Sequence, residues 1–241
     1  RSVVGHLASG VPGAVAGING TFFALAAIRE TDNRLVGPCL TTGGTAVLPD
    51  PETFRYEKLK NRPIVVMSPD RFAVVPYNPW TMSTDAVFRA FRPALTDVFM
   101  GGAWLVRAGV PATESELRTF GSKDLMDFRR RALFGIDGRG RIFLACAKQS
   151  CSSEKFAAAA AEAGAREAVL LDSGFSTSLV YDGKILASGH STKDNPSRPV
   201  PHAILLKGAL DPEGRKVAKA AEPATTLTGG DPAPRRRRKR R

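Results

Sequence analysis

The stretch from residue 165 to residue 189 constrains the fold more than any other part of this chain. It begins with an apolar run, Ala168 to Leu171, which has the length and composition of a buried strand. Further on, Asp182-Gly183 is the two-residue signal of a β-hairpin, because both turn positions favour positive φ. The hairpin strands are expected at 178–181 and 184–188. The stretch therefore predicts a buried strand followed by a β-hairpin.

An acid, Asp172, stands directly after the apolar run and opens a turn that is rich in small residues. A carboxylate at the end of a buried strand, in a loop with little side-chain bulk, is a place where a ligand can approach the backbone. The same residue can instead cap the turn by accepting hydrogen bonds from nearby N–H groups. The sequence leaves both interpretations open.

The rest of the chain repeats the hairpin pattern and contains few helices. Helix signals are clearest at 152–163, where Ser152 or Ser153 can cap the start and Gly164 can end the helix. These elements predict an α+β fold with a mixed β-sheet, hairpins and few helices in a single domain. The other expected strands and helices are two β segments within 63–75, strands at 103–107, 133–136, 141–147 and 199–207, and a short helix at 83–91.

Charge divides the chain into residues 1–208, expected to form the domain, and residues 209–241, expected to be a flexible linker and basic tail. The net charge is +12, but Arg235 to Arg241 supply seven cations, so the rest of the chain carries only +5. Such a tail binds polyanions loosely through counterion release. A localisation signal, a tether to an anionic surface, a nucleic-acid arm and a solubilising terminus are all compatible with it. It has no interleaved aromatic residues, so it offers no platform for base stacking.

The cysteines give no sign of a metal site. Cys39, Cys146 and Cys151 are odd in number, and their spacing does not match a zinc ribbon or a redox pair. We therefore expect no metal and no cofactor. No apolar run of the sequence is long enough to span a bilayer, so no transmembrane segment is expected either.

Four stretches, in this order and spacing, resemble the phosphodiester glycosidase family, which includes the lysosomal uncovering enzyme and many bacterial and phage proteins. They are GINGTFF at 17–23, GGAWLVRAG at 101–109, RALFGID at 131–137 and LLDSGFSTSLVYDGK at 170–184. The sequence RPVPHAILL at 198–206 resembles the closing strand of the family.

The resemblance implies hydrolysis of a sugar-1-phosphodiester at the anomeric carbon, with a sugar phosphate or a polysaccharide as substrate. It also favours an extracytoplasmic or secreted location. It assigns catalytic roles to Asp172 and Arg131. The substrate-binding residues that it implies are Asn19, Gly20, Gly101, Gly102, Gly174, Ser176 and Arg198.

These residue types suit the reaction. Glycosyl cleavage passes through an oxocarbenium-like state, which a carboxylate near the anomeric carbon stabilises. A phosphate leaving group is a weak base, so it requires cations and N–H donors more than a general acid. Asp137 is a second carboxylate candidate, although Asp137-Gly138 also reads as a turn, and His190 and His202 are candidate acids.

The chain departs from the family pattern at three positions. Ser173 and Phe175 stand where the Asp-Gly-Gly-Gly-Ser loop has glycines, and Ala132 stands where threonine is usual. A phenylalanine in the loop can narrow the pocket. One alternative is therefore a catalytically impaired carbohydrate-binding or exopolysaccharide-assembly protein of the same fold. Another is polyanion or nucleic-acid binding through the basic tail.

Overall fold

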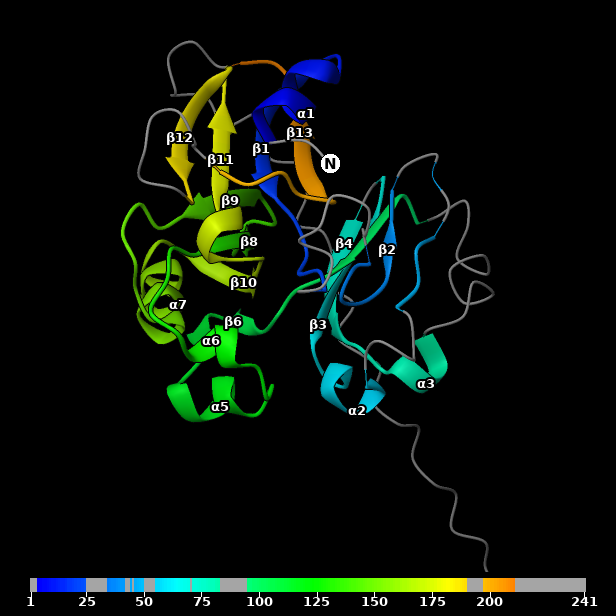
Figure 1. Cartoon of the computed structure of the whole chain (residues 1–241), viewed down its shortest axis with the longest axis vertical. Coiled ribbons are helices and arrows are strands. Elements are labelled where there is room, and N and C mark those ends of the chain that lie inside the picture. The colour runs from blue at the N-terminus through cyan, green and yellow to red at the C-terminus, as the bar shows by residue number, and fades with distance from the viewer. Residues whose placement is uncertain are drawn as a thin grey trace, which may run out of the picture.

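The structure is a computed structural model that describes residues 4–24, 34–41, 44, 46–49, 55–69, 71–82, 95–189 and 197–210. The strands of these residues form two four-stranded sheets and one five-stranded sheet, with few and mostly short helices (Figure 1). This arrangement confirms the α+β class. The helix expected at 83–91 and nearly all of the linker and basic tail lie outside the described residues.

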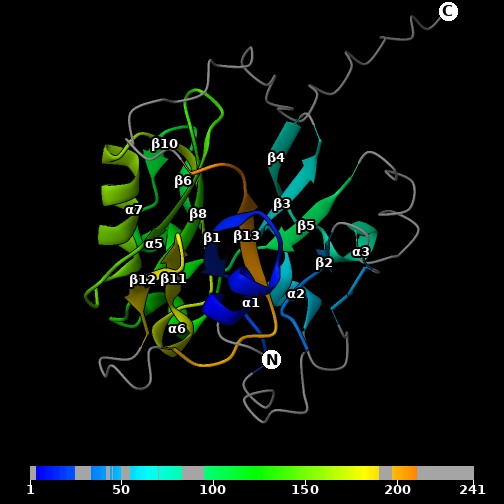
Figure 2. The same ribbon diagram turned by 90° about the horizontal axis from the view of Figure 1, so that it is seen from above.

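The five-stranded sheet has the order β7-β6-β10-β8-β9, and α7 packs along its outer face (Figure 2). The α7 helix begins after Ser152, whose hydroxyl accepts a hydrogen bond from the N–H of Lys155 (3.2 Å), and it buries Phe156 and Ala160. Each neighbouring pair of strands is antiparallel, so β9 and β10 run parallel on either side of β8. The bounds are β6 Trp104–Arg107, β7 Val110–Pro111, β8 Ala132–Asp137, β9 Ile142–Cys146, α7 Ser153–Glu162 and β10 Ala165–Leu170.

A four-stranded sheet of order β12-β11-β1-β13 lies above it in Figure 1, covered by α1. Its β11–β12 hairpin turns at Asp182 and Gly183 with φ values of 48° and 69°, which confirms the predicted two-residue turn. The bounds are α1 Val4–Gly10, β1 Ala14–Asn19, β11 Ser178–Tyr181, β12 Lys184–Ser188 and β13 Ala203–Lys207.

The other four-stranded sheet has the order β2-β5-β3-β4 and forms the opposite side of the molecule (Figures 1 and 2). Two short helices that were not among the elements expected from the sequence occur near it. The bounds are β2 Cys39–Leu40, α2 Tyr56–Leu59, β3 Pro63–Ser68, β4 Arg71–Pro76, α3 Pro79–Met82 and β5 Asp97–Met100. The polar segment 113–127 likewise contains α5 Glu114–Arg118 and α6 Lys123–Met126.

One apolar cluster connects the three sheets. Ile18 of β1, Phe99 of β5 and Phe134 of β8 are all buried in it, and the last two rings pack edge to face with centroids 5.3 Å apart. Burial of this cluster supplies the hydrophobic stabilisation that holds the sheets to one another. Among the described helices, none has the length and apolarity required to cross a membrane.

The glycine pair at Gly101 and Gly102 lies where the chain passes from β5 of one sheet to β6 of another. Gly101 N–H donates to the carbonyl of Pro63, and Gly102 N–H donates to the carbonyl of Leu170, both at 2.8 Å. A Cβ at Gly101 would lie 2.8 Å from Cβ of Val169, and one at Gly102 would overlap the ring of Phe22. The pair therefore permits close packing between sheets.

Candidate active site

The loop after β10 lies at the junction of two sheets. Leu171 N–H still donates to Ala132 of β8 (2.9 Å), but Asp172 N–H donates to the carbonyl of Gly20, which follows β1 (3.0 Å). The backbone thus leaves the five-stranded sheet at Leu171 and joins the end of β1 one residue later. Asp172 is held at this crossing by main-chain hydrogen bonds, so its position does not depend on a flexible loop.

Asn19 fixes both ends of the same loop. Its Nδ2 donates to the carbonyl of Asp172 (2.7 Å), and its Oδ1 accepts from the N–H of Ser178 (3.0 Å). Asn19 is fully buried. The expected role for Asn19 was contact with a substrate oxygen, but in this structure its amide positions the loop that carries Asp172.

Asp172 is partly exposed as a residue, but its carboxylate is surrounded by protein. Burial raises the pKa of Asp172 from 3.8 to about 6. The N–H of Ser173, which donates to Oδ1 (2.9 Å), and the positive charge of Arg198 act in the opposite direction, while the charge of Asp124 adds to the rise. A carboxyl group with this pKa exchanges protons near neutral pH, as acid–base catalysis requires.

Ser176 points its hydroxyl toward this carboxylate. Its proximity lowers the pKa of Asp172, although the contact does not reach hydrogen-bond geometry, and Oγ is buried with no partner among the described groups. A buried hydroxyl without a partner is unusual in proteins. Ser176 is therefore free to donate to a ligand beside Asp172.

The two loop positions that depart from the family pattern do not close the site. Ser173 has an extended backbone (φ −129°, ψ 178°) that any residue adopts, and its hydroxyl turns back to donate to the carbonyl of Leu171 (3.1 Å). Phe175 is 56% exposed. Between them, Gly174 has a φ of +67°, the left-handed conformation that favours glycine. The loop retains its glycine where the backbone requires one.

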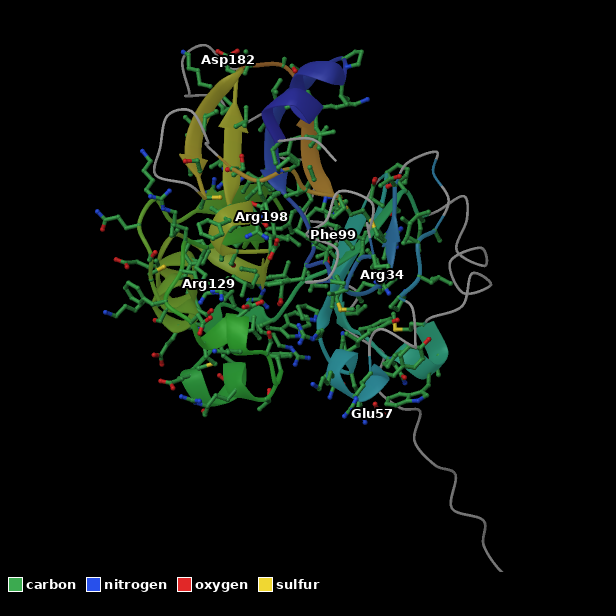
Figure 3. All side chains as sticks on the ribbon, in the orientation of Figure 1. Arg34, Glu57, Phe99, Arg129, Asp182 and Arg198 are labelled. Carbon is green, nitrogen blue, oxygen red and sulfur yellow. The ribbon has the colours of Figure 1, made fainter. Side chains whose placement is uncertain are left out.

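Two arginines lie beside the loop. Arg198 places its guanidinium 5.3 Å from the centre of the Phe175 ring and makes no ion pair with the described acids. Arg129 is paired with Asp124 (2.9 Å) and Asp127 (2.5 Å), and its side chain is 3.6 Å from where a Cβ of Gly174 would stand. In Figure 3 the labels of both arginines lie on the left half of the molecule, with Arg198 above Arg129.

Arg131, to which the family resemblance assigns a catalytic role, is bonded to main-chain carbonyls in this structure. It is completely buried, and its guanidinium donates to the main-chain carbonyls of Asp124 (2.8 Å), Leu125 (3.4 Å), Asp127 and Cys151 (3.4 Å). These bonds use four of its five N–H donors and hold the loop around α6, so the geometry favours a structural role for Arg131. The physical reason is that a guanidinium can satisfy several otherwise unpaired carbonyls at once.

Gly20 and His202 pack against each other below the loop. A Cβ at Gly20 would overlap the imidazole ring, and Nδ1 of His202 accepts a hydrogen bond from the N–H of Thr21 (3.1 Å). Burial lowers the pKa of His202 to about 4, so the ring is neutral at pH 7. His202 is thus a poor general acid at that pH, while His190 lies outside the described residues. Asp137 caps its own hairpin turn, accepting from the N–H groups of Arg139 and Arg141 (both 2.9 Å).

Sequence reasoning missed Asp124 and Arg129 as neighbours of the Asp172 loop. The signal available was a group of charges of both signs between residues 123 and 131, which is equally typical of a solvated surface. Within the part of the chain that the structure describes, no three His, Cys, Asp or Glu side chains are grouped in a way that could hold a metal ion.

A carboxyl group of raised pKa on which the charge of Arg198 acts is a candidate functional site. Comparison with protein families matches residues 12–207 to the family described as phosphodiester glycosidase. The chain belongs to this family. A search of curated proteins returned no match.

One solved structure shows a similar fold, and two others match with lower scores. The catalytic domain of zebrafish N-acetylglucosamine-1-phosphodiester alpha-N-acetylglucosaminidase, auto-inhibited by its pro-peptide, is similar with a TM-score of 0.64 and 16% identity, covering 87% of this chain and 68% of that one. A hypothetical protein from Synechocystis has a TM-score of 0.48 at 16% identity, covering 77% and 50%. A putative exported protein from Burkholderia pseudomallei has a TM-score of 0.46 at 15% identity, covering 85% and 68%.

Proposed function

We propose that this protein hydrolyses a sugar-1-phosphodiester at the anomeric carbon, with Asp172 as the reacting carboxylate. The observation that carries the proposal is the raised pKa of Asp172, about 6, at a strand end that the backbone fixes in place. Membership of the phosphodiester glycosidase family supports the reaction class. The sugar in the name of the zebrafish enzyme is the substrate of that enzyme and does not identify the sugar bound by this chain.

In the proposed reaction the bond between the anomeric carbon and the phosphate oxygen breaks. Asp172, ionised, either accepts a proton from the attacking water or attacks the anomeric carbon itself. In the second case water later hydrolyses the glycosyl ester. Both routes release the free sugar and a phosphate monoester. The phosphate oxygen leaves as an anion, so no protonated side chain is needed to receive the bond electrons.

Arg198 is the residue that we propose for holding the phosphate. Its positive charge acts on Asp172, and its guanidinium is not paired with a described carboxylate. A guanidinium binds two phosphate oxygens at once in a planar geometry. Ser176 would donate its unpartnered hydroxyl to the substrate, and the exposed ring of Phe175 would contact the sugar or the group beyond the phosphate.

The first prediction concerns turnover. Asp172→Asn should lower the rate of glycosyl phosphodiester hydrolysis by about 100-fold or more, because the amide can neither accept a proton nor attack the anomeric carbon. Release of the free sugar from a UDP-sugar and from a simple glycosyl phosphodiester would be measured at pH 7.5.

Asp182→Asn is the matched control, since it makes the same substitution in an exposed turn where asparagine tolerates positive φ. It should leave turnover unchanged. Undiminished turnover in a folded Asp172→Asn variant would remove Asp172 from the reaction and overturn the proposal.

Sugar-phosphate binding without turnover is the second candidate. Asp124, which lies near enough to act on Asp172, is itself held by Arg129 at 2.9 Å, so it is not free to serve as a second reacting carboxylate. A wild-type protein that binds glycosyl phosphates through Arg198 but releases no sugar would favour this candidate over catalysis.

A further inference from the structure

A hollow of about 430 Å³ lies between α2 and the loop that leads into α6. Both elements are labelled in the lower half of Figure 1, on facing sides of the molecule. The hollow is separate from the loop at Asp172, because no residue from 172 to 178 lines it. Its volume falls within the range of small-molecule sites in proteins.

Four cations line this hollow and no acidic residue does. They are Arg55 and Lys58 from the α2 side, Lys123 from the α6 side, and Arg62 at the base. The first three are exposed, whereas Arg62 is only 7% exposed. Ser122 also lines the hollow, and its hydroxyl does not cap the helix that follows it.

Arg62 distinguishes this hollow from an ordinary basic surface. Its guanidinium donates to the carbonyls of Lys58 (2.9 Å), Gly102 (2.9 Å) and Phe120 (3.0 Å). It has no carboxylate partner among the described residues. Burial lowers its pKa to about 10, so the side chain remains charged at pH 7. A buried charge is costly unless it is paired.

The three carbonyls use three of the five N–H donors of Arg62, and carbonyl dipoles do not neutralise a full positive charge. Two donors remain without a partner among the described residues, and Arg62 is one of the residues that line the hollow. An anion in the hollow would accept from them and supply the missing counter-charge, and the flexible side chains of Lys58 and Lys123 could close over it from opposite sides.

We propose that the hollow between α2 and α6 is a second anion site, which binds a phosphorylated ligand of the size of a monosaccharide phosphate. Arg62 provides the fixed contact with the anion. Further positive charge around the anion comes from Arg55, Lys58 and Lys123. This site does not depend on a catalytic role for Asp172.

The probes are glucose 6-phosphate, inorganic phosphate and unphosphorylated glucose, measured by titration calorimetry with the full chain at low ionic strength. Arg62 is left intact because it supports two loops. The test variant is R55Q/K58Q/K123Q. The control variant R139Q/K148Q/K184Q removes the same three charges from exposed positions outside the hollow. The basic tail is present in both, so its contribution cancels.

Glucose 6-phosphate should bind the wild type and the control variant alike, and bind the test variant about tenfold more weakly or worse. Glucose should not bind at this site. Equal weakening in both variants would show a response to overall charge and overturn the proposal. So would loss of binding in Arg198→Gln with no loss in the test variant, because the phosphate would then lie at the Asp172 loop. Absence of binding at millimolar concentration would overturn it as well.

The Asp172→Asn variant separates this proposal from the catalytic one. It should retain binding of glucose 6-phosphate in the hollow, whatever its effect on turnover. Conversely, the test variant should retain the pH 7.5 turnover of a simple glycosyl phosphodiester if that substrate reaches only the Asp172 loop.

Discussion

Asp172 bears its charge in surroundings that disfavour it. Burial raises its pKa to about 6, and the neighbouring Asp124 adds to this effect, while Arg198 only partly compensates. A structural capping aspartate usually shows the opposite shift, as Asp137 does, because hydrogen bonds from N–H groups and a paired arginine lower its pKa. The two acids therefore illustrate the two interpretations of a strand-end aspartate that the sequence left open.

The raised pKa predicts how stability depends on pH. Because the folded-state pKa of Asp172 lies above the ordinary 3.8, the folded state binds the proton more tightly. The stabilising contribution of the protonated form is complete below about pH 4 and is lost as the pH rises through 6. Asp172→Asn removes this loss, so at pH 7.5 it should raise the free energy of unfolding by about 1–3 kcal/mol.

Urea denaturation at pH 4.5 and pH 7.5 would test this. The difference between Asp172→Asn and the wild type should be much smaller at the lower pH. Asp182→Asn, in the exposed hairpin turn, should show the same small difference at both. An equal effect of Asp172→Asn at both pH values would contradict the charge-burial explanation.

At the scale of elements, the junction of β1, β10 and β11 depends on one amide. Asn19 joins Asp172, which follows β10, to Ser178 at the start of β11. Strand ends at a sheet junction leave main-chain groups without ladder partners, and a buried unpaired group is costly. The family resemblance implied a substrate-binding role for Asn19, whereas the structure shows its amide bonded to residues far along the chain.

Asn19→Ala should therefore lower the free energy of unfolding by about 2–4 kcal/mol, since it leaves the carbonyl of Asp172 and the N–H of Ser178 without partners. Asn78→Ala is the control, because Asn78 is exposed and its Oδ1 accepts only from the nearby N–H of Trp80 (3.1 Å). Its cost should stay below about 1 kcal/mol. A similar loss of unfolding free energy for the two variants in urea denaturation would argue against this role of Asn19, which we call a clamp between Asp172 and Ser178.

At the scale of the whole molecule, three sheets share one core, so they should unfold together. The chain has two tryptophans, whose fluorescence reports on opposite sides of the molecule. Trp104 lies in β6 of the five-stranded sheet, and Trp80 lies in α3 beside the sheet of β3 and β5. Trp80 is 53% exposed and Trp104 only 8%, so their fluorescence spectra should differ.

Trp80→Phe and Trp104→Phe each leave a single reporter. Their urea transitions should coincide with the transition measured by circular dichroism in the same variant, as a two-state domain requires. A fluorescence midpoint that departs from the circular dichroism midpoint in either variant would show that the two sides unfold separately.

Much of the local structure followed from the sequence. Asp182-Gly183 predicted its hairpin, the alanine-rich run after Ser152 predicted its helix, and the apolar run before Asp172 predicted its strand, because turn chemistry, capping and burial act within a few residues. The short helices at 56–59 and 79–82 were missed. Four-residue helices have little intrinsic propensity and depend on the surfaces against which they pack.

The sequence by itself determined the α+β class, the family motifs and Asp172 as the candidate carboxylate, since each is recorded in neighbouring residues. Only the tertiary structure decided what the other site residues do. It buried Arg131 among carbonyls, made Asn19 a clamp, turned Gly101 and Gly102 into packing contacts, and gathered Arg62 with distant cations around one hollow. A side chain's role depends on which distant groups compete for its donors and on how much water reaches it, and neither is encoded in local spacing.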